Sequence, residues 1–179
     1  SSVPSTPMKE VIPMSTQALF NARMLWVVDQ LVTAAVKLDG NPSPEKQGGY
    51  LTVICGNNSV MELQSIIGQI VLEKKDKYRE FSEEKPTRLM WNPAHVSSHQ
   101  SRDPENGQWG GAIRAGKYFI GFSGLPELLD EAVVTVAAWH MNLITKNDIR
   151  PIVEASSNPF TYPLFNSLLS IPEMPAMPA

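Results

Sequence analysis

The stretch GGAIRAGKYFIGFSGLPELLDEAVVTVAA, residues 110–138, decides the fold of this chain. Within it, residues 111–115 and 117–122 are largely apolar and meet at Gly116, a pattern that predicts two strands joined by a tight turn. A serine–glycine pair then breaks the second strand, and a proline followed by acidic residues opens a helix over about 125–144. The stretch therefore predicts a β-hairpin that leads directly into an amphipathic helix.

Upstream of this stretch, the sequence predicts a long helix and a buried strand. Apolar residues recur at three- and four-residue steps over 20–38, with Ser15 or Thr16 placed to cap the helix and Gly40 to end it. Residues 50–55 are apolar or β-branched almost without interruption and are flanked by glycines. This pattern is typical of a strand that is buried on both faces.

The chain from 59 to 81 predicts a second helix. Residues 59–62 have the spacing of a capping box, and the apolar residues behind them recur at helical steps until a charged run that ends near Phe81. The segment 82–109 is the least regular part of the chain, and residues 88–91 within it predict a short strand. A loop of this length is often functional.

Composition predicts a single core and excludes several classes of function. The chain has 179 residues, of which 42% are hydrophobic, a net charge of −3 and a pI of about 5.6. This mildly acidic balance argues against a nucleic-acid binder, which usually carries a basic face. No apolar run approaches the roughly 20 residues that span a bilayer, and no secretory signal is recognisable, so we expect a cytoplasmic protein without a membrane partner.

The single cysteine, Cys55, excludes an intrachain disulfide and fits a reducing compartment. Its place at the end of a buried strand predicts an inert thiol. Proline content divides the chain into an extended arm over 1–14, one domain over 15–150 and a proline-rich extension over 151–179. The extension is too apolar for a solvated tail, so we expect it to lie on its own domain or on a neighbouring subunit.

Helices, a strand and a hairpin in this order predict a mixed α/β (α+β) fold in which helices cover a sheet. Residues 110–113, 116–124 and 130–132 together resemble the GlcG-like family, also described as a haem-degrading or haem-binding domain. That family has a glycine pair that opens a strand, a hairpin that ends in Gly-x-Ser-Gly, and an Asp-Glu-Ala on the closing helix. The clear match is confined to these segments, and a weaker one extends over most of 15–145.

The resemblance implies a profilin-like α/β/α arrangement with a five-stranded antiparallel sheet flanked by helices, commonly assembled into homo-oligomers. It also implies a small-molecule ligand. Some members bind haem or act in haem transport or sensing, others accompany metabolic operons, and some look like lyases that act on hydroxylamino-aromatic acids. Two features depart from the family pattern: the long loop before Gly110 and the extension after residue 150.

Two histidines of the long loop, His95 and His99, are candidate catalytic residues. On a helix their spacing would place both imidazoles on one face, as in some metal sites. A nearby proline and several serines disfavour a helix, and no third ligand lies close, so no metal site is predicted. The histidines either act on a small acidic molecule or are ordinary surface residues.

Arg102, Trp109 and the glycine pair Gly110–Gly111 are candidate ligand-binding residues. The guanidinium group binds a carboxylate through two parallel hydrogen bonds, although an ordinary ion pair with Asp103 would also explain Arg102. The indole of Trp109 either stacks on a planar ligand or closes the sheet edge. The glycines allow a ligand to approach the backbone closely.

Further candidates surround the start of the last helix. Ser123 and Gly124 do not form the G-x-S-x-G turn of a hydrolase, because the second glycine comes one place early, and they cap the helix or bind an anion at its N-terminus. Glu131, beside Asp130, is either a catalytic acid or base or a complement to the helix dipole. His140 lies on the apolar stripe as a core histidine or as a ligand of haem.

Three functions follow from these candidates. The first is a non-enzymatic binder of a small molecule, with haem as the cofactor that the resemblance suggests. The alternative is a cofactor-independent lyase or isomerase that acts on a small carboxylic acid, for example an aromatic one. The third is an interaction module that binds a partner through its proline-rich arms.

Overall fold

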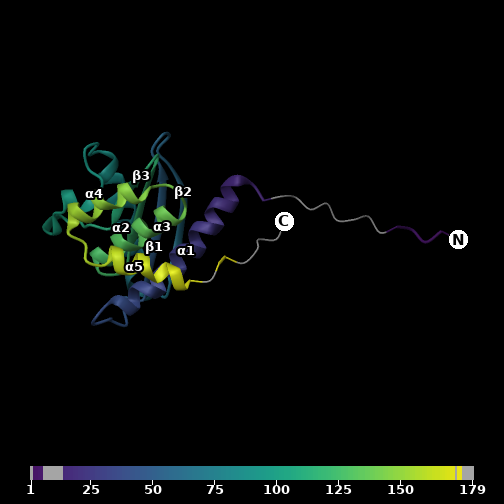
Figure 1. Ribbon diagram of the computed structural model, residues 1–179, viewed down its shortest axis with the longest axis horizontal. Coiled ribbons are helices and arrows are strands. Elements are labelled where there is room, and N and C mark those ends of the chain that lie inside the picture. The colour runs from purple at the N-terminus through teal and green to yellow at the C-terminus, as the bar shows by residue number, and fades with distance from the viewer. Residues whose placement is uncertain (1, 6–13, 172, 175–179) are drawn as a thin grey trace.

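A computed structural model describes residues 2–5, 14–171, 173 and 174 of the chain. Most of the arm expected over 1–14 and the end of the extension expected up to 179 lie outside these residues. Along the rest, a helix and a pair of strands occur twice in succession, and consecutive helices follow (Figure 1). The elements are α1 (Thr16–Leu38), β1 (Gly48–Cys55), β2 (Val60–Gly68), α2 (Lys75–Met90), β3 (Ala112–Ala115), β4 (Tyr118–Ser123), α3 (Glu127–His140), α4 (Lys146–Ser156) and α5 (Thr161–Ser167).

The strands form one open sheet in the order β2-β1-β4-β3, and every neighbouring pair is antiparallel. This confirms the mixed α/β class and the antiparallel sheet. The described residues form four strands, whereas the resemblance implies five. The predicted hairpin is confirmed as β3 and β4, which turn at Gly116 with a φ of 61°, a left-handed conformation that glycine adopts without strain.

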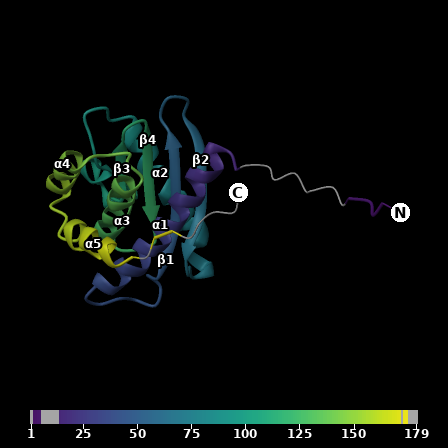
Figure 2. The same cartoon turned by 45° about the vertical axis from the view of Figure 1, so that its right-hand side comes forward.

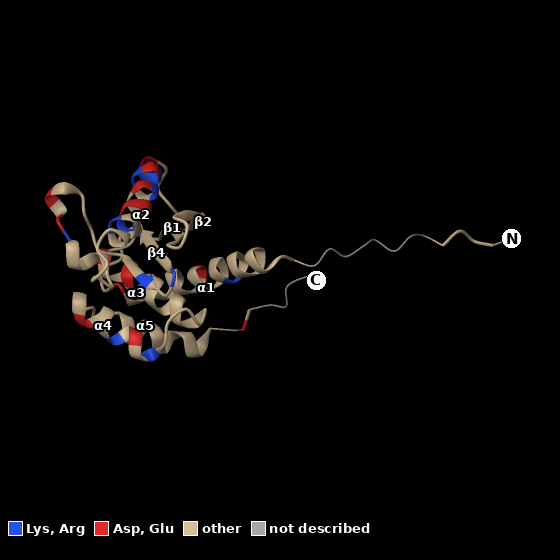
Figure 3. Ribbon diagram, turned by 90° about the horizontal axis from the view of Figure 1, so that it is seen from above, with Lys and Arg blue, Asp and Glu red and all other residues tan. Residues whose placement is uncertain are grey.

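Helices cover both faces of the sheet, so the molecule has three layers. Figure 3 shows α2 on one side of the strands and α1, α3, α4 and α5 on the other. Alternate residues of β1 face the two layers: Leu51 and Val53 pack in the core with α1 and α3, and Ile54 packs with Leu89 of α2. All residues of β1 are buried, as the sequence predicts.

The long first helix is confirmed. Ser15 caps α1 through a hydrogen bond from the backbone N–H of Ala18, and the helix lies against α3 and β2 (Figure 2). Among the described residues, α1 is the one helix that is long and apolar enough, by length and composition, to cross a membrane. One face of it is buried in the core through Met24, Val27, Val28, Leu31, Val32 and Ala35.

The predicted helix from 59 to 81 is wrong in its first part. Residues 60–68 form β2, which pairs with β1 along its length, and the helix α2 begins only at Lys75. The apolar spacing of β2 fits a helix as well as a half-exposed edge strand, so pairing with β1 decides between them. The short strand predicted at 88–91 is also wrong, because α2 continues through Met90.

The proline-rich C-terminal part packs on its own domain as far as the structure describes it. The helix α4 runs across residue 150, where the sequence suggests that the extension begins. The helix α5 lies against α1 and α3, with Leu164 buried in the main core. Pro163 lies in the first turn of α5, where a proline removes no helical hydrogen bond, whereas Pro151 lies inside α4.

Candidate functional site

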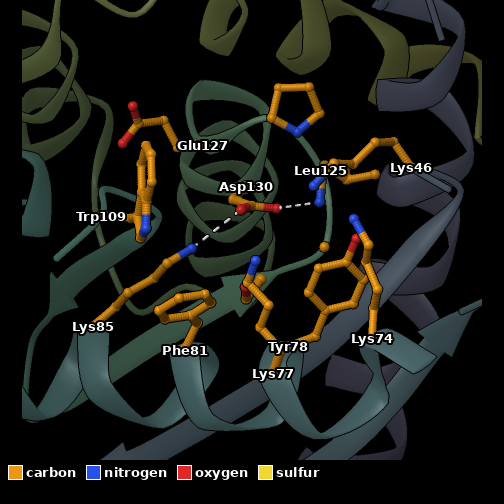
Figure 4. Close-up of a pocket in the computed structure, with 13 residues that line it drawn as sticks. Lys46, Lys74, Lys77, Tyr78, Phe81, Lys85, Trp109, Leu125, Glu127 and Asp130 are labelled. Atoms are coloured by element: carbon orange, nitrogen blue, oxygen red, sulfur yellow. Dashed lines mark hydrogen bonds and ion pairs between the residues drawn. The ribbon is translucent and has the colours of Figure 1, made fainter. Parts of the chain in front are cut away.

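A cavity of about 380 Å³ lies between α2 and the start of α3, below the loop that leads into β1 (Figure 4). This volume suits a small organic ligand. The glycine-rich turn at the end of β4 forms one wall. The β3–β4 hairpin and the helix α3, both from the stretch 110–138 and its continuation, therefore meet at this cavity. The lining residues are Lys46, Lys74, Lys77, Tyr78, Phe81, Lys85, Trp109, Ser123, Gly124, Leu125, Pro126, Glu127 and Asp130.

A buried ion pair between Lys85 and Asp130 forms the floor of the cavity. The Lys85 Nζ lies 3.1 Å from Oδ2 of Asp130, and each side chain is only 2% exposed. The ammonium also donates to the backbone carbonyl of Phe122 at 2.8 Å. Oδ1 of Asp130 accepts the backbone N–H of Leu125 at 2.9 Å, so both carboxylate oxygens are held in place.

The carboxyl of Asp130 titrates in the physiological range. Burial raises the pKa of Asp130 to about 6, and the Lys85 ammonium prevents a larger rise. A buried acid of this kind at the floor of a cavity is a candidate for binding or proton-transfer chemistry. Both members of this ion pair line the cavity.

Two glycines allow close packing around the cavity, Gly111 beside the ion pair and Gly124 beside the start of β1. Gly111 has a φ of 119°, and a Cβ at this position would lie 2.7 Å from the Lys85 Nζ. Gly124 has a φ of 151°, and a Cβ there would lie 2.1 Å from the carbonyl oxygen of Gly48. Residues with a side chain would therefore displace the lysine or part the strands.

Aromatic rings and lysines form the walls. Tyr78 and Phe81 come from α2, and the Nζ atoms of Lys46 and Lys77 lie 5.1 and 5.7 Å from the centres of these two rings. Lys74 lies 3.1 Å from Glu45, whose hydrogen bond and negative charge raise the pKa of this lysine. Figure 4 shows Asp130 near the centre, with Trp109 and Lys85 on one side of it, Tyr78, Lys74 and Lys46 on the other, and Phe81 and Lys77 below.

The charge of the lining is positive on balance. Its carboxylates are both engaged by the protein: Asp130 with Lys85, and Glu127 with Arg102 at 2.6 Å and with the backbone N–H of Gly110 at 2.8 Å. A cavity with surplus ammonium groups favours an anionic ligand, and the aromatic walls favour a flat one.

The structure places the predicted ligand-binding residues at different distances from the cavity. Trp109, Ser123 and Gly124 line it. Gly110 and Gly111 lie directly behind, next to Glu127 and Lys85. Arg102 stacks over the Trp109 ring at 5.3 Å, and the carboxylate that it binds belongs to Glu127 of the same chain.

The predicted catalytic residue Glu131 does not line the cavity. Its carboxylate is 1% exposed and accepts hydrogen bonds from the Ser97 hydroxyl, the Ser156 hydroxyl at 2.5 Å and the Asn158 amide at 2.7 Å. These groups come from the long loop and from the end of α4 and the chain beyond it. Glu131 therefore joins three parts of the chain in the interior.

His95 and His99 do not line the cavity either. Each has a buried Nδ1 atom without a hydrogen-bond partner, and the His99 ring packs against Gly110. In the described part of the chain, no group of three or more His, Cys, Asp or Glu side chains could hold a metal ion. His99 therefore lies behind the cavity wall beside Gly110, and neither histidine lines the cavity with Lys85 and Asp130.

His140 lies apart from the first cavity. It lines a second cavity of about 370 Å³ with Arg23 and Trp26, and the two rings of His140 and Trp26 are 6.2 Å apart. Burial, with a smaller effect of Arg23, lowers the pKa of His140. This histidine is the candidate for a haem ligand that the sequence suggests.

The first cavity offers one side chain of a type that holds haem iron. Haem iron is held by His, Cys, Met or Tyr side chains. Tyr78 is the one lining residue of these types, and its hydroxyl donates to the backbone carbonyl of Glu45 at 3.4 Å.

The sequence did not indicate the lining residues Lys46, Lys77, Tyr78 and Phe81, nor Lys85 at the floor. Lys85 is the one for which a signal existed. It lies on the buried stripe of α2 with Tyr78, Ser82 and Leu89, at three- and four-residue steps. A lysine in such a stripe is rarely buried unless it is paired, so its position could have indicated a buried carboxylate partner. The sequence alone offers no means to tell which of the acidic residues is that partner.

No protein-family model matches the chain, and neither a curated protein nor a solved structure does. The function is therefore argued from the cavity and its residues.

Proposed function

We propose that this protein binds a small planar organic acid, such as an aromatic carboxylic acid, in the cavity between α2 and α3. The observation that carries the proposal is the set of aromatic rings and lysines around the buried Lys85–Asp130 pair. Lys46 and Lys77 supply positive charge at the walls for the carboxylate of the ligand. The rings of Tyr78, Phe81 and Trp109 supply flat apolar surface for the rest of it.

This proposal agrees with the resemblance to the GlcG-like family, to which we propose that the chain belongs. Membership would imply the profilin-like fold and a homo-oligomer, and we propose both, together with a cytoplasmic location. The glycine pair that carries the resemblance supports the site directly. Gly111 allows the backbone to pass beside Lys85, and the N–H of Gly110 fixes Glu127 at the cavity wall.

The binding proposal is tested by calorimetric titration with benzoate and with cyclohexanecarboxylate, which has the same charge and a non-planar ring. We expect benzoate to bind more tightly than cyclohexanecarboxylate, because only benzoate can stack on the aromatic walls. We expect the double variant K46M/K77M to bind benzoate about tenfold or more weakly, since it loses two cations at the cavity.

The matched control is Lys75→Met, which removes a lysine of the same helix that does not line the cavity. Benzoate affinity in this variant should equal that of the unmodified protein. Absence of binding by either acid, or an equal loss in K75M and in K46M/K77M, would contradict the proposal.

A haem-binding function is the alternative, with His140 in the second cavity as the candidate ligand of the iron. Because we propose an organic acid as the ligand, we expect haemin to give no Soret band with this protein. Titration of the unmodified protein and of His140→Ala with haemin tests whether haem binds through this histidine. A Soret band that is present in the first and lost in the second would favour haem over the organic acid.

A further inference from the structure

We infer that the cavity is also a catalytic site for proton transfer, in which Asp130 removes a proton from the carbon next to a carbonyl group while Lys85 stabilises the carbonyl oxygen. The substrate class is a small 2-oxo acid with a C–H bond beside the oxo group, and the reaction is enolisation. The inference rests on the proposed binding of an organic acid and adds a reaction to it.

Lys85 has one N–H donor that its protein partners do not use. An ammonium group has three N–H donors. One of them is directed to the carbonyl of Phe122 and one to Asp130, at 2.8 and 3.1 Å. The third donor remains for a ligand oxygen, and because Lys85 lines the cavity, that oxygen can come from a bound acid. A fixed cation of this kind stabilises the negative charge that develops on an enolate oxygen.

The carboxylate of Asp130 is held in a fixed orientation. Lys85 holds Oδ2 and the backbone N–H of Leu125 holds Oδ1, so the carboxylate cannot rotate. Each oxygen of a carboxylate has about two acceptor positions, and each of these oxygens uses one for the contacts named. The remaining positions are available to a proton of a bound ligand. A base with fixed geometry beside a fixed cation is the arrangement that enolisation requires.

The proposed step balances without an oxidant or a metal. Asp130 takes a proton from C3 of the 2-oxo acid, and the electrons of that C–H bond form a carbon–carbon double bond. The carbonyl electron pair moves to oxygen, which accepts a proton from the Lys85 ammonium, and the product is the enol. In the reverse direction the amine regains its proton, and Asp130 returns a proton to carbon after exchange with solvent.

Burial raises the pKa of Asp130, whereas the Lys85 ammonium, the backbone N–H of Leu125 and the Lys46 ammonium lower it. Lys85, Lys77, Lys74 and Tyr78 face the cavity from α2, Lys46 faces it from the loop before β1, and Glu127 faces it from α3. With a pKa of about 6, the carboxyl is mainly ionised at pH 7, which is the form that a base needs.

The experiment follows exchange of the C3 protons of phenylpyruvate in D2O by proton NMR, with the full chain. We expect the unmodified protein to exchange these protons about 100-fold faster than the buffer does. The Asp130→Asn variant should fall to the buffer rate while it still binds benzoate. The K75M variant should exchange at the unmodified rate.

A second measurement does not depend on whether D130N folds. Because the base must be ionised, the exchange rate of the unmodified protein should rise about tenfold per pH unit below pH 6 and become level above it. A rate that does not change between pH 5 and 8, or exchange that persists in folded D130N, would overturn the assignment of Asp130. Benzoate binding without any exchange overturns the reaction and leaves the binding proposal intact, whereas absence of binding overturns the binding proposal itself.

Discussion

Replacing Lys85 by methionine is expected to lower the free energy of unfolding by about 3–5 kcal/mol at pH 8. The substitution removes the cation that lies 3.1 Å from Asp130 and leaves a buried carboxylate with only the N–H of Leu125 as a donor. A charge that is buried without its partner loses its hydration and gains nothing in return. Urea unfolding followed by tryptophan fluorescence measures the loss.

The loss in K85M should depend on pH in a defined direction. Burial raises the pKa of Asp130 to about 6 in the folded protein, above its ordinary value of 3.8, so folding favours the protonated acid. The stability that this group contributes is therefore complete below about pH 4 and is lost as the pH rises. Without Lys85 the folded pKa is higher still, and the deficit of K85M should widen between pH 6 and 8.

The double variant K85M/D130L provides the control. A buried ion pair replaced by apolar side chains of similar size usually costs little stability. We therefore expect the double variant to recover most of the stability that K85M loses, and to show no pH dependence between 6 and 8. A double variant as unstable as K85M would show that packing at these positions, and not the unpaired charge, causes the loss.

Replacing Glu131 by alanine is expected to lower the free energy of unfolding by about 3 kcal/mol or more. The carboxylate is the common acceptor for Ser97, Ser156 and Asn158, all of which are buried. The Ser156 hydroxyl can turn to the carbonyl of Ile152, its second partner at 3.4 Å. Ser97 would lose its acceptor, and Asn158 would keep for its amide only the carbonyl of Leu128.

The Glu131 prediction separates a structural role from a catalytic one. Benzoate affinity per folded molecule should not change in E131A, since this side chain does not line the cavity. The matched control is Glu154→Ala, which removes an exposed carboxylate that pairs with Arg150 on α4, and its urea midpoint should equal that of the unmodified protein. A stable E131A that no longer binds benzoate would place Glu131 in the binding site.

Parts of the fold with strong local signals could be predicted from the sequence. Over 16–38 the apolar residues and the Ser15 cap point to the same helix, and over 112–123 the apolar segments and Gly116 point to the same hairpin. The edge strand β2 could not be predicted, because its apolar residues satisfy a helical spacing as well. Its hydrogen bonds to β1, the preceding strand, hold it extended, and the spacing of apolar residues does not reveal this pairing.

The residues of the candidate site also divide into those that the sequence indicates and those that it does not. Trp109, Ser123 and Gly124 were recognisable because an aromatic residue and a glycine-rich turn border the hairpin, and they line the cavity. The sequence predicts Glu131 as the catalytic acid or base, whereas its neighbour Asp130 is the one of the two that lines the cavity. Adjacent positions on a helix point about 100° apart, and the sequence does not show which of the two directions meets a pocket.

By itself, therefore, the sequence determined the first helix, the central strand, the hairpin and the helix that follows, since in each of these the propensities of neighbouring residues agree. Only the tertiary structure decided that residues 60–68 form a strand and that Lys85 meets Asp130. Those two residues are 45 positions apart, and the packing of α2 across the sheet brings them together. Pairing over that distance depends on how the layers stack, which local patterns in the sequence do not encode.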